Sequence, residues 1–246
     1  MKSFLFTIIF AGFSLATIAQ DSTVSKKNKK DWSKVSLANR SKDHFMFQTG
    51  YNMWTQAPDS IQTKGLARSV NVYFMMDFPF KSDPRLSVAI GGGIASDHQY
   101  FKNSYVDVAG TKANRLGFYN VADTTHFKKY KLNTTYLEAP VEMRFSSNPE
   151  NPNKTFKAAI GLKFGYLASA GTKGKNLLNY KGNLINAYTE KEKSKKYFST
   201  SRLSLTGRVG YGVFSLYASY QINSFVKDGY GPDIRPMQIG LTISGL

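Results

Sequence analysis

The sequence predicts an all-β protein: an eight-stranded, antiparallel, up-and-down transmembrane β-barrel. Three observations lead to this fold. The first residues have the pattern of a secretory signal, eight later segments alternate apolar and polar residues, and the connections between these segments are alternately short and long. Alternation with a period of two indicates strands. Membrane barrels turn an apolar face to lipid and carry short periplasmic turns with longer external loops.

The start of the chain predicts export. Lys2 precedes a short apolar run, and Thr17-Ile18-Ala19 forms a small-residue cleavage site. Residues 1–19 are therefore predicted to be a signal peptide; the alternative is a retained helical anchor, although the run is shorter than a membrane-spanning helix needs. Residues 20–43 are polar and lysine-rich and are predicted to form a flexible basic periplasmic arm. Residues 44–246 form the predicted outer-membrane barrel domain.

Composition limits the chemistry and the partners. The chain contains no cysteine, which excludes a lipoprotein, a disulfide scaffold and thiolate sites. Its formal net charge is +17, a balance that favours nucleic acid or an anionic surface as partner. Because the chain is predicted to be exported, we expect no nucleic acid and favour an anionic membrane surface.

The first three strands are predicted at residues 44–54, 66–78 and 86–95. In the first, Phe45 and Phe47 alternate with polar or flexible residues, and the second has apolar residues at every even position from Val70 to Phe78. The third pairs a branched apolar face with a face of small residues. Side chains of a strand point alternately to its two faces, so each segment has one apolar side.

The next two strands form the clearest hairpin. Residues 132–145 and 154–168 alternate throughout, and the segment between them is rich in Asn and Pro, which are turn residues. The last three strands are predicted at residues 200–210, 213–222 and 236–244 by the same alternation. Connections after the second, fourth and sixth strands are short, whereas residues 96–131 and 169–199 are predicted to be long polar loops. Both barrel termini are therefore expected on the periplasmic side.

The hairpin also resembles a known family. The hairpin consists of TYLEAPVEMRF, a polar turn and FKAAIGLKFGY, and it resembles the outer-membrane β-barrel domain of the PorT-like proteins of Bacteroidota. Two further features resemble that group: a signal that ends in Ala-Gln, and a first strand that opens with DHFMFQTGYNMW. The resemblance covers nearly the whole mature chain and implies the architecture of small OmpA- and OmpX-type barrels. The founding member of the family belongs to a protein-secretion apparatus.

Charged residues fall on the predicted inward face. An eight-stranded barrel is just wide enough for its own side chains, and buried charges need partners. We therefore predict an ion-pair network that plugs the lumen; the alternative is a gated channel or proton path. The network comprises Glu138, Glu142, Arg144, Lys157, Lys163, Arg202 and Arg208. One register sets Glu138 opposite Lys163, and another sets Glu142 opposite Lys157.

The second long loop predicts contact with anionic lipid at the outer rim. Its lysines would meet lipid head groups and its aromatic residues the interface. The predicted contact set is Lys191, Lys193, Lys195, Lys196, Tyr197 and Phe198. The alternative is a solvated loop with a basic bias.

No enzyme motif is visible. No serine lies in a nucleophile motif, and His98 and His126 fall in one predicted loop without the spacing of a ligand pair. We expect no catalytic residue, no metal and no cofactor; the alternative from the enzyme class is an outer-membrane lipid or peptide hydrolase. The expected function is a monomeric outer-membrane barrel with a structural or surface-interaction role and lipopolysaccharide as a candidate partner. The alternative is a component of a protein-secretion or transport machine.

Overall fold

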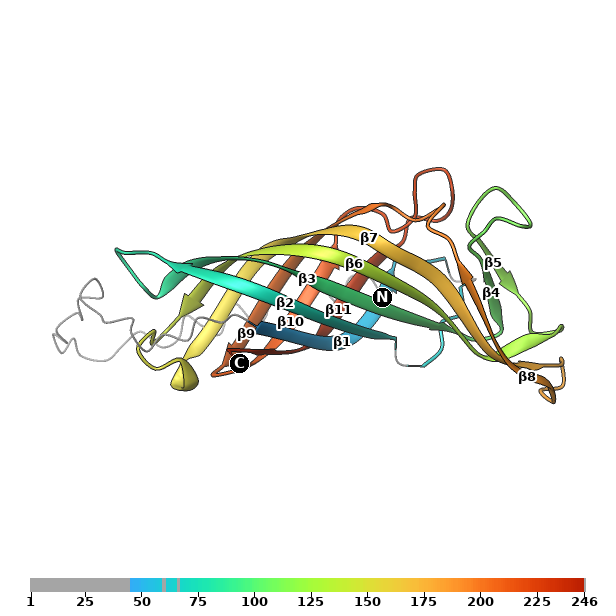
Figure 1. Ribbon diagram of the computed structural model, residues 1–246, viewed down its shortest axis with the longest axis horizontal. Coiled ribbons are helices and arrows are strands. Elements are labelled where there is room, and N and C mark those ends of the chain that lie inside the picture. The colour runs from blue at the N-terminus through green and yellow to red at the C-terminus, as the bar shows by residue number, and fades with distance from the viewer. Residues whose placement is uncertain (1–44, 59–60, 66, 246) are drawn as a thin grey trace, which may run out of the picture. The chain divides into compact units, whose positions relative to one another are not determined.

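Eight antiparallel strands close into a barrel in the computed structural model, which describes residues 45–58, 61–65 and 67–245 (Figure 1). The barrel strands are β1 (Phe45–Thr55), β2 (Arg68–Pro79), β3 (Leu86–Phe101), β6 (His126–Ser146), β7 (Phe156–Leu178), β9 (Ser201–Tyr211), β10 (Phe214–Gln221) and β11 (Arg235–Ser244). Each strand pairs with its neighbour along the barrel, and the first and last strands pair with each other, with Met46 opposite Ser244. The predicted fold class is confirmed.

Part of the sequence lies outside this description. The predicted signal peptide (residues 1–19) and basic arm (residues 20–43) fall outside the described residues, as does His44. Among the described residues, no helix is long and apolar enough to cross a membrane.

The barrel has the polarity of a membrane protein. On β1, Phe45 and Phe47 are exposed on the outside, whereas Met46 and Gln48 are fully buried inside. The other barrel strands repeat this pattern, and their outward side chains are mostly large and apolar. An apolar outer face and a polar interior are the arrangement that lipid imposes on a closed barrel.

The connections differ between the two barrel ends. At the end that contains Phe45 and Ser244, the strands are joined by residues 80–85, 147–155 and 212–213. The connection at residues 147–155 contains a single 3₁₀ turn, η3 (Pro152–Lys154). At the opposite end, residues 56–67, 102–125, 179–200 and 222–234 make longer connections. The predicted alternation of short and long connections is therefore present.

The two predicted long loops are wrong in detail, because much of each is strand. β3, β6 and β7 extend beyond the predicted limits, and β8 (Leu184–Lys193) pairs with the end of β7. β4 (Ser104–Asp107) and β5 (Gly117–Asn120) form a separate hairpin (Figure 1). The outward faces of these extensions are mostly polar or basic, so the apolar outer face that marks a membrane strand is missing there. We call residues 126–135, 169–178 and β8 together the outer ribbon.

A β-bulge marks where the outer ribbon begins. Tyr136 pairs with Leu167, but Thr135 pairs with Ser169, so Ala168 is an extra residue on β7. A bulge reverses which positions of its strand face outward. Before it, the outward residues of β7 are apolar, such as Phe164 and Tyr166; after it they are polar or basic.

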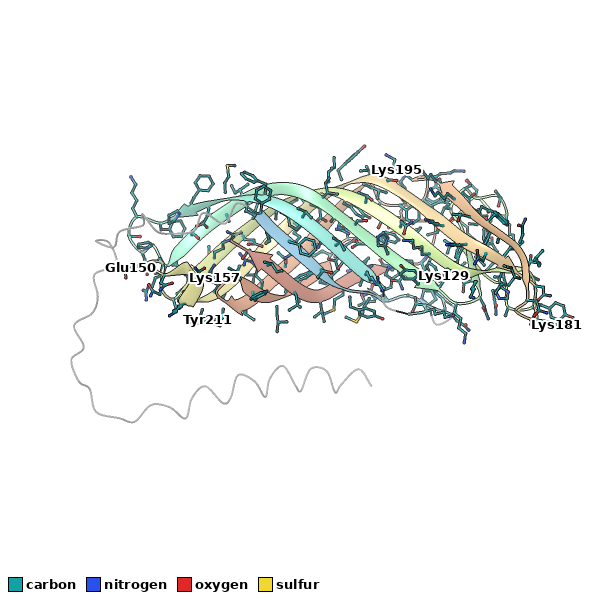
Figure 2. The ribbon with its side chains drawn as sticks, turned by 60° about the horizontal axis from the view of Figure 1, so that its bottom comes forward. Lys129, Glu150, Lys157, Lys181, Lys195 and Tyr211 are labelled. Carbon is teal, nitrogen blue, oxygen red and sulfur yellow. The ribbon has the colours of Figure 1, made fainter. Side chains whose placement is uncertain are left out.

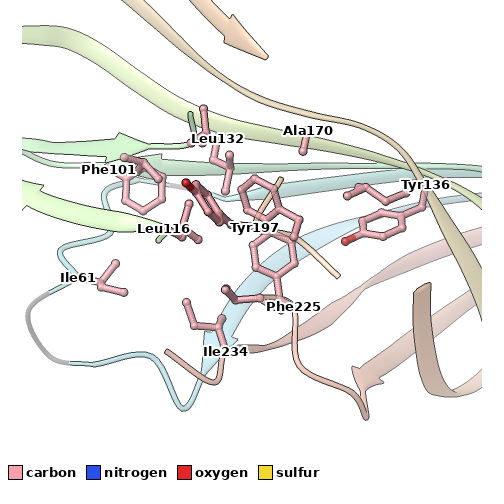
Figure 3. Packing of buried hydrophobic residues seen from close by; sticks show 14 of the residues in the cluster. Ile61, Phe101, Leu116, Leu132, Tyr136, Ala170, Tyr197, Phe225 and Ile234 are labelled. Atoms are coloured by element: carbon pink, nitrogen blue, oxygen red, sulfur yellow. The ribbon is translucent and has the colours of Figure 1, made fainter. Parts of the chain in front are cut away.

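A cluster of buried apolar residues closes the long-connection end of the barrel from inside (Figure 3). We call it the apolar cap. It consists of Ile61, Ala95, Phe101, Val106, Val108, Leu116, Tyr130, Leu132, Tyr136, Leu167, Ala170, Tyr197, Phe198, Phe225, Val226 and Ile234. These residues come from strand ends and from all four long connections. The connections are therefore packed together over the lumen.

Candidate functional site

The lumen holds the densest group of charged side chains. β6 supplies Glu138 and Glu142, β9 supplies Arg202 and Arg208, and β7 lies between these two strands. All four residues are less than 7% exposed. These residues all have even numbers, and they face inward because apolar residues occupy the outward, odd-numbered positions of both strands.

Arg202 is the centre of an upper network. Its Nε donates to Glu138 Oε1 at 2.7 Å, its Nη1 donates to Asp97 Oδ2 at 2.6 Å, and its Nη2 also donates to Glu138. Its guanidinium lies over the Tyr136 ring, 4.0 Å from the centroid. The Tyr73 hydroxyl donates to the other oxygen of Glu138 at 2.5 Å. Bidentate and charge-assisted bonds of this kind hold buried ions in one geometry.

Lys163 extends the upper network towards β1. Its Nζ donates to Gln48 Oε1 at 2.7 Å, and Gln48 in turn donates to Thr242 at 3.0 Å. The ammonium group also lies 5.1 Å and 5.5 Å from the ring centroids of Tyr73 and Tyr217. Aromatic faces attract a desolvated cation, so Lys163 is held by an amide and two rings.

A lower network lies nearer the short-turn end. Arg144 and Arg208 both donate to Glu142 Oε2, at 3.0 Å and 3.1 Å. Arg144 also lies 3.8 Å from Asp77, which accepts from Ser87 at 2.7 Å. Removing one member of such a buried pair leaves an uncompensated charge, at a typical cost of about 3–5 kcal/mol.

Six of the seven predicted lumen residues are thus buried inside the barrel. The exception is Lys157, which is half-buried at the start of β7 beside the short turn. Neither predicted register is found: Glu138 lies opposite Gly165, Glu142 lies opposite Gly161, and Lys163 lies opposite Pro140. Small residues opposite the glutamates leave room for the arginines of the next strand.

Gly165 shows why this register works. It pairs with Glu138 on one side and with Arg202 on the other. A Cβ at this position would lie 3.2 Å from Cβ of Arg202 and 3.3 Å from Cγ of Glu138. The glycine therefore lets two side chains from non-adjacent strands meet across β7.

Asp97, Asp77 and Tyr73 belong to the networks but were not predicted. Asp97 has the same parity as the small inward residues Ala89 and Ala95 of β3. That parity was the available signal, but the predicted strand ended at residue 95. With these additions, four carboxylates face four cations inside the described barrel: Asp77, Asp97, Glu138 and Glu142 with Arg144, Lys163, Arg202 and Arg208.

Little space remains above the upper network. A cavity of about 10 Å³ lies among Asn52, Asp97, Gln99 and Arg202, which is room for about one water. Beyond it lie Trp54 and Phe225, whose ring centroids are 5.5 Å apart, at the base of the apolar cap. Charged side chains in ion pairs and the apolar cap thus occupy successive levels of the barrel.

Comparison with known proteins agrees with this architecture. The family described as outer membrane protein beta-barrel domain matches residues 9–227. The chain belongs to that family. Among curated proteins, none matches it. The family places this barrel in the outer membrane, so its exposed apolar side chains face lipid.

Most exposed lysines of the outer-membrane barrel lie at the long-connection end. Figure 2 shows Lys129, Lys181 and Lys195 towards that end and Glu150 and Tyr211 towards the other. Lys191, Lys193, Lys195 and Lys196 are all exposed, as predicted for a lipid-contacting set. Lys195 lies 5.9 Å from the centroid of the Tyr166 ring.

The prediction that Tyr197 and Phe198 contact lipid is wrong. Both side chains are 0% exposed and belong to the apolar cap. Figure 3 shows Tyr197 within the cap. The Phe198 ring packs against Phe225 at 5.1 Å, and Tyr197 packs against Tyr230 at 5.6 Å. Aromatic residues after a lysine run suggested an interface, but here they anchor the connection to the barrel interior.

The two described histidines make local contacts. His98 Nδ1 lies 2.7 Å from Asn133 Oδ1, and His126 Nδ1 lies 3.1 Å from the Thr124 carbonyl. His98 lies on β3 rather than in a loop. In the part of the chain that the structure describes, no group of three or more metal-binding side chains is close enough to hold an ion.

Proposed function

We propose that this outer-membrane barrel is a closed, monomeric protein with a structural or surface-interaction role and no catalytic activity. The observation that carries the proposal is the filling of the lumen. Arg202 joins carboxylates of β3 and β6 across the interior, and the apolar cap lies above them. A solute would have to break buried ion pairs and a packed cluster to pass.

The proposal includes an orientation. Outer-membrane barrels keep short turns in the periplasm and long connections outside, so the end that contains Phe45 and Ser244 is assigned to the periplasm. The outer ribbon and the apolar cap then belong to the cell surface. This assignment also agrees with a predicted periplasmic arm at residues 20–43.

Conductance measurements test the closed lumen. The purified barrel in planar bilayers should give no stable open pore, and the folded protein should migrate differently on gels before and after heating. A reproducible large conductance from wild-type protein would contradict the proposal.

Single cysteines test the orientation, because the chain has none of its own. Lys181→Cys lies at the tip between β7 and β8, and Lys154→Cys lies in the short turn before β7. A membrane-impermeant maleimide added to intact cells should label only Lys181→Cys. Labelling of Lys154→Cys alone would reverse the orientation.

The second candidate function is a component of a secretion or transport machine. The resemblance to PorT-like barrels supports it, as does the outer ribbon, which extends well beyond the apolar belt and offers a surface to another protein. Isolation from outer membranes in mild detergent tests it. A stoichiometric secretion partner would favour this role, whereas recovery with lipid alone would favour the first.

A further inference from the structure

The outer ribbon carries a row of lysines that the register places side by side. Lys131 on β6 lies directly opposite Lys173 on β7, which lies directly opposite Lys191 on β8. We call these three residues the lysine row. Lys193 lies on the same face, one pair further along β8, opposite Gly171. Like charges directly opposite each other destabilise a sheet.

None of these four lysines forms an ion pair with a residue that the structure describes. The nearest acidic residues in sequence, Glu190 and Glu192, alternate with them and face the other side of β8. There Glu192 accepts from the Tyr105 hydroxyl at 3.4 Å, beside the β4–β5 hairpin. The carboxylates of β8 are therefore on the wrong face to neutralise the lysine row.

The lysines surround a hollow rather than a flat surface. A pocket of about 300 Å³ is lined by Lys131, Lys173, Lys191, Lys193, Thr135 and Ser169. Burial, followed by the charges of Lys173 and Arg68, lowers the pKa of Lys131 below its usual value. The pocket thus combines concentrated positive charge with hydroxyl donors, which is the chemistry that phosphate groups require.

The position of the pocket points to lipid as the source of the phosphate. Immediately below it, Leu137 is 51% exposed and Tyr166 is 56% exposed on the lipid face. Thr135 and Ser169 are the next outward residues above them, at the β-bulge. The outward surface therefore changes from apolar at Leu137 to hydroxyl-bearing at Thr135, and it becomes basic at Lys131, two outward positions further along β6. Such a gradient matches the height where acyl chains end and head groups begin.

We infer that this pocket binds the phosphate groups of a phosphorylated lipid of the outer leaflet, with its acyl chains along Leu137, Phe164 and Tyr166. The inference rests on the proposed orientation, which places the outer ribbon at the cell surface. The lipid site inferred here differs from the predicted aromatic rim at Tyr197 and Phe198, because its centre is formed by Lys131 and Lys173. Lys191 and Lys193 of the predicted set form its outer wall.

Lipid binding in detergent micelles tests the inference. The probe is lipid A with both phosphates, the comparison is dephosphorylated lipid A, and bound lipid is counted by native mass spectrometry. The test variant is Lys131→Gln/Lys173→Gln/Lys191→Gln. The matched control, Lys64→Gln/Lys102→Gln/Lys181→Gln, removes the same charge from exposed lysines at the same end of the barrel.

Each lysine near an anionic head group contributes about fivefold to binding, so the test variant should bind phosphorylated lipid A at least about tenfold more weakly than wild type. The control should bind like wild type, and wild type should prefer the phosphorylated lipid. Equal binding by test and control variants would overturn the inference. Binding of inorganic phosphate by the wild type without binding of phosphorylated lipid A would also overturn it, because the site would then take a free anion.

Folding is checked by heat-modifiable gel mobility in every variant. Where the triple variant does not fold, Lys173→Gln alone removes the centre of the row. Conductance is measured on the wild-type protein, and orientation on the single-cysteine variants Lys181→Cys and Lys154→Cys. A closed, correctly oriented barrel that ignores lipid phosphate would defeat this inference alone, whereas an open pore would defeat the proposed function alone.

Discussion

In the lumen, four carboxylates lie among four cations, and each arginine contacts at least one carboxylate. On the outward face of the outer ribbon, the lysine row and Lys193 have no carboxylate partner among the described residues. Both regions include residues of β6 and β7. The difference follows from solvent: an enclosed charge must be balanced inside the protein, whereas a charge at a membrane surface can be balanced by ions or lipid.

The largest expected effect comes from removing one lumen charge. Glu138→Ala leaves Arg202 with only Asp97 and removes the acceptor of Tyr73, so the free energy of unfolding should fall by about 3–5 kcal/mol. Urea titration followed by gel mobility measures it. Glu190→Ala, on the exposed part of β8, is the matched control and should have little effect. Equal stability of both variants would show that the lumen charges are solvated.

Removing an aromatic ring from the apolar cap should have the next largest effect. Phe198→Ala leaves a cavity beside Phe225 and should cost about 3 kcal/mol. Because the cap joins the long connections, we expect faster proteolysis of residues 222–234 while the barrel remains folded. Phe164→Ala, on the lipid face, is the control, since lipid can fill the space that it leaves. Unchanged proteolysis of Phe198→Ala would mean that the cap does not hold the connections.

A methyl group at Gly165 should have a moderate effect. Gly165→Ala places its Cβ between Glu138 and Arg202 and should destabilise the barrel by about 1–3 kcal/mol. Gly207→Ala is the control, because the nearest atom to its Cβ is 3.9 Å away. Matching unfolding curves for the two variants would contradict the role given to Gly165.

The smallest expected effect has the opposite sign. Lys131→Gln/Lys173→Gln removes a like-charge pair and should stabilise the barrel in lipid-free detergent by about 0.5 kcal/mol. High salt screens this repulsion, so the gain should be lost there. Urea titration at low and high salt measures both. A loss of stability at low salt would show that these lysines have partners in the folded protein.

The sequence was sufficient for the fold class and for the inward face of most strands, because a period of two assigns every residue to a face. It was insufficient for the register of β6 and β7. Registers that differ by two residues keep the same side chains on the same face, so alternation could not distinguish Gly165 from Lys163 as the partner of Glu138. Asp97 was assigned to a loop because the apolar signal of β3 ends before the strand does.

The apolar cap could not be predicted from the sequence, for a different reason. Its members come from connections far apart in the sequence, and none of these connections has a periodic pattern of its own. Tyr197 and Phe198 therefore suggested an interface with lipid, although they pack against Phe225 and Tyr230. Only the closed barrel brings these segments together.

The contacts of Arg202 also affect the order in which the strands join the barrel during folding. Its two carboxylate partners lie 64 and 105 residues away along the chain, and contacts of long sequence separation form late because loop closure precedes them. Until β9 joins β7 and β3 lies across the interior, all three charges need water. Expulsion of that water and pairing of the charges therefore coincide with closure. When β9 separates during unfolding, Arg202, Glu138 and Asp97 all lose their partners at once. Separation of β9 is therefore slow, and this gives the closed barrel kinetic stability.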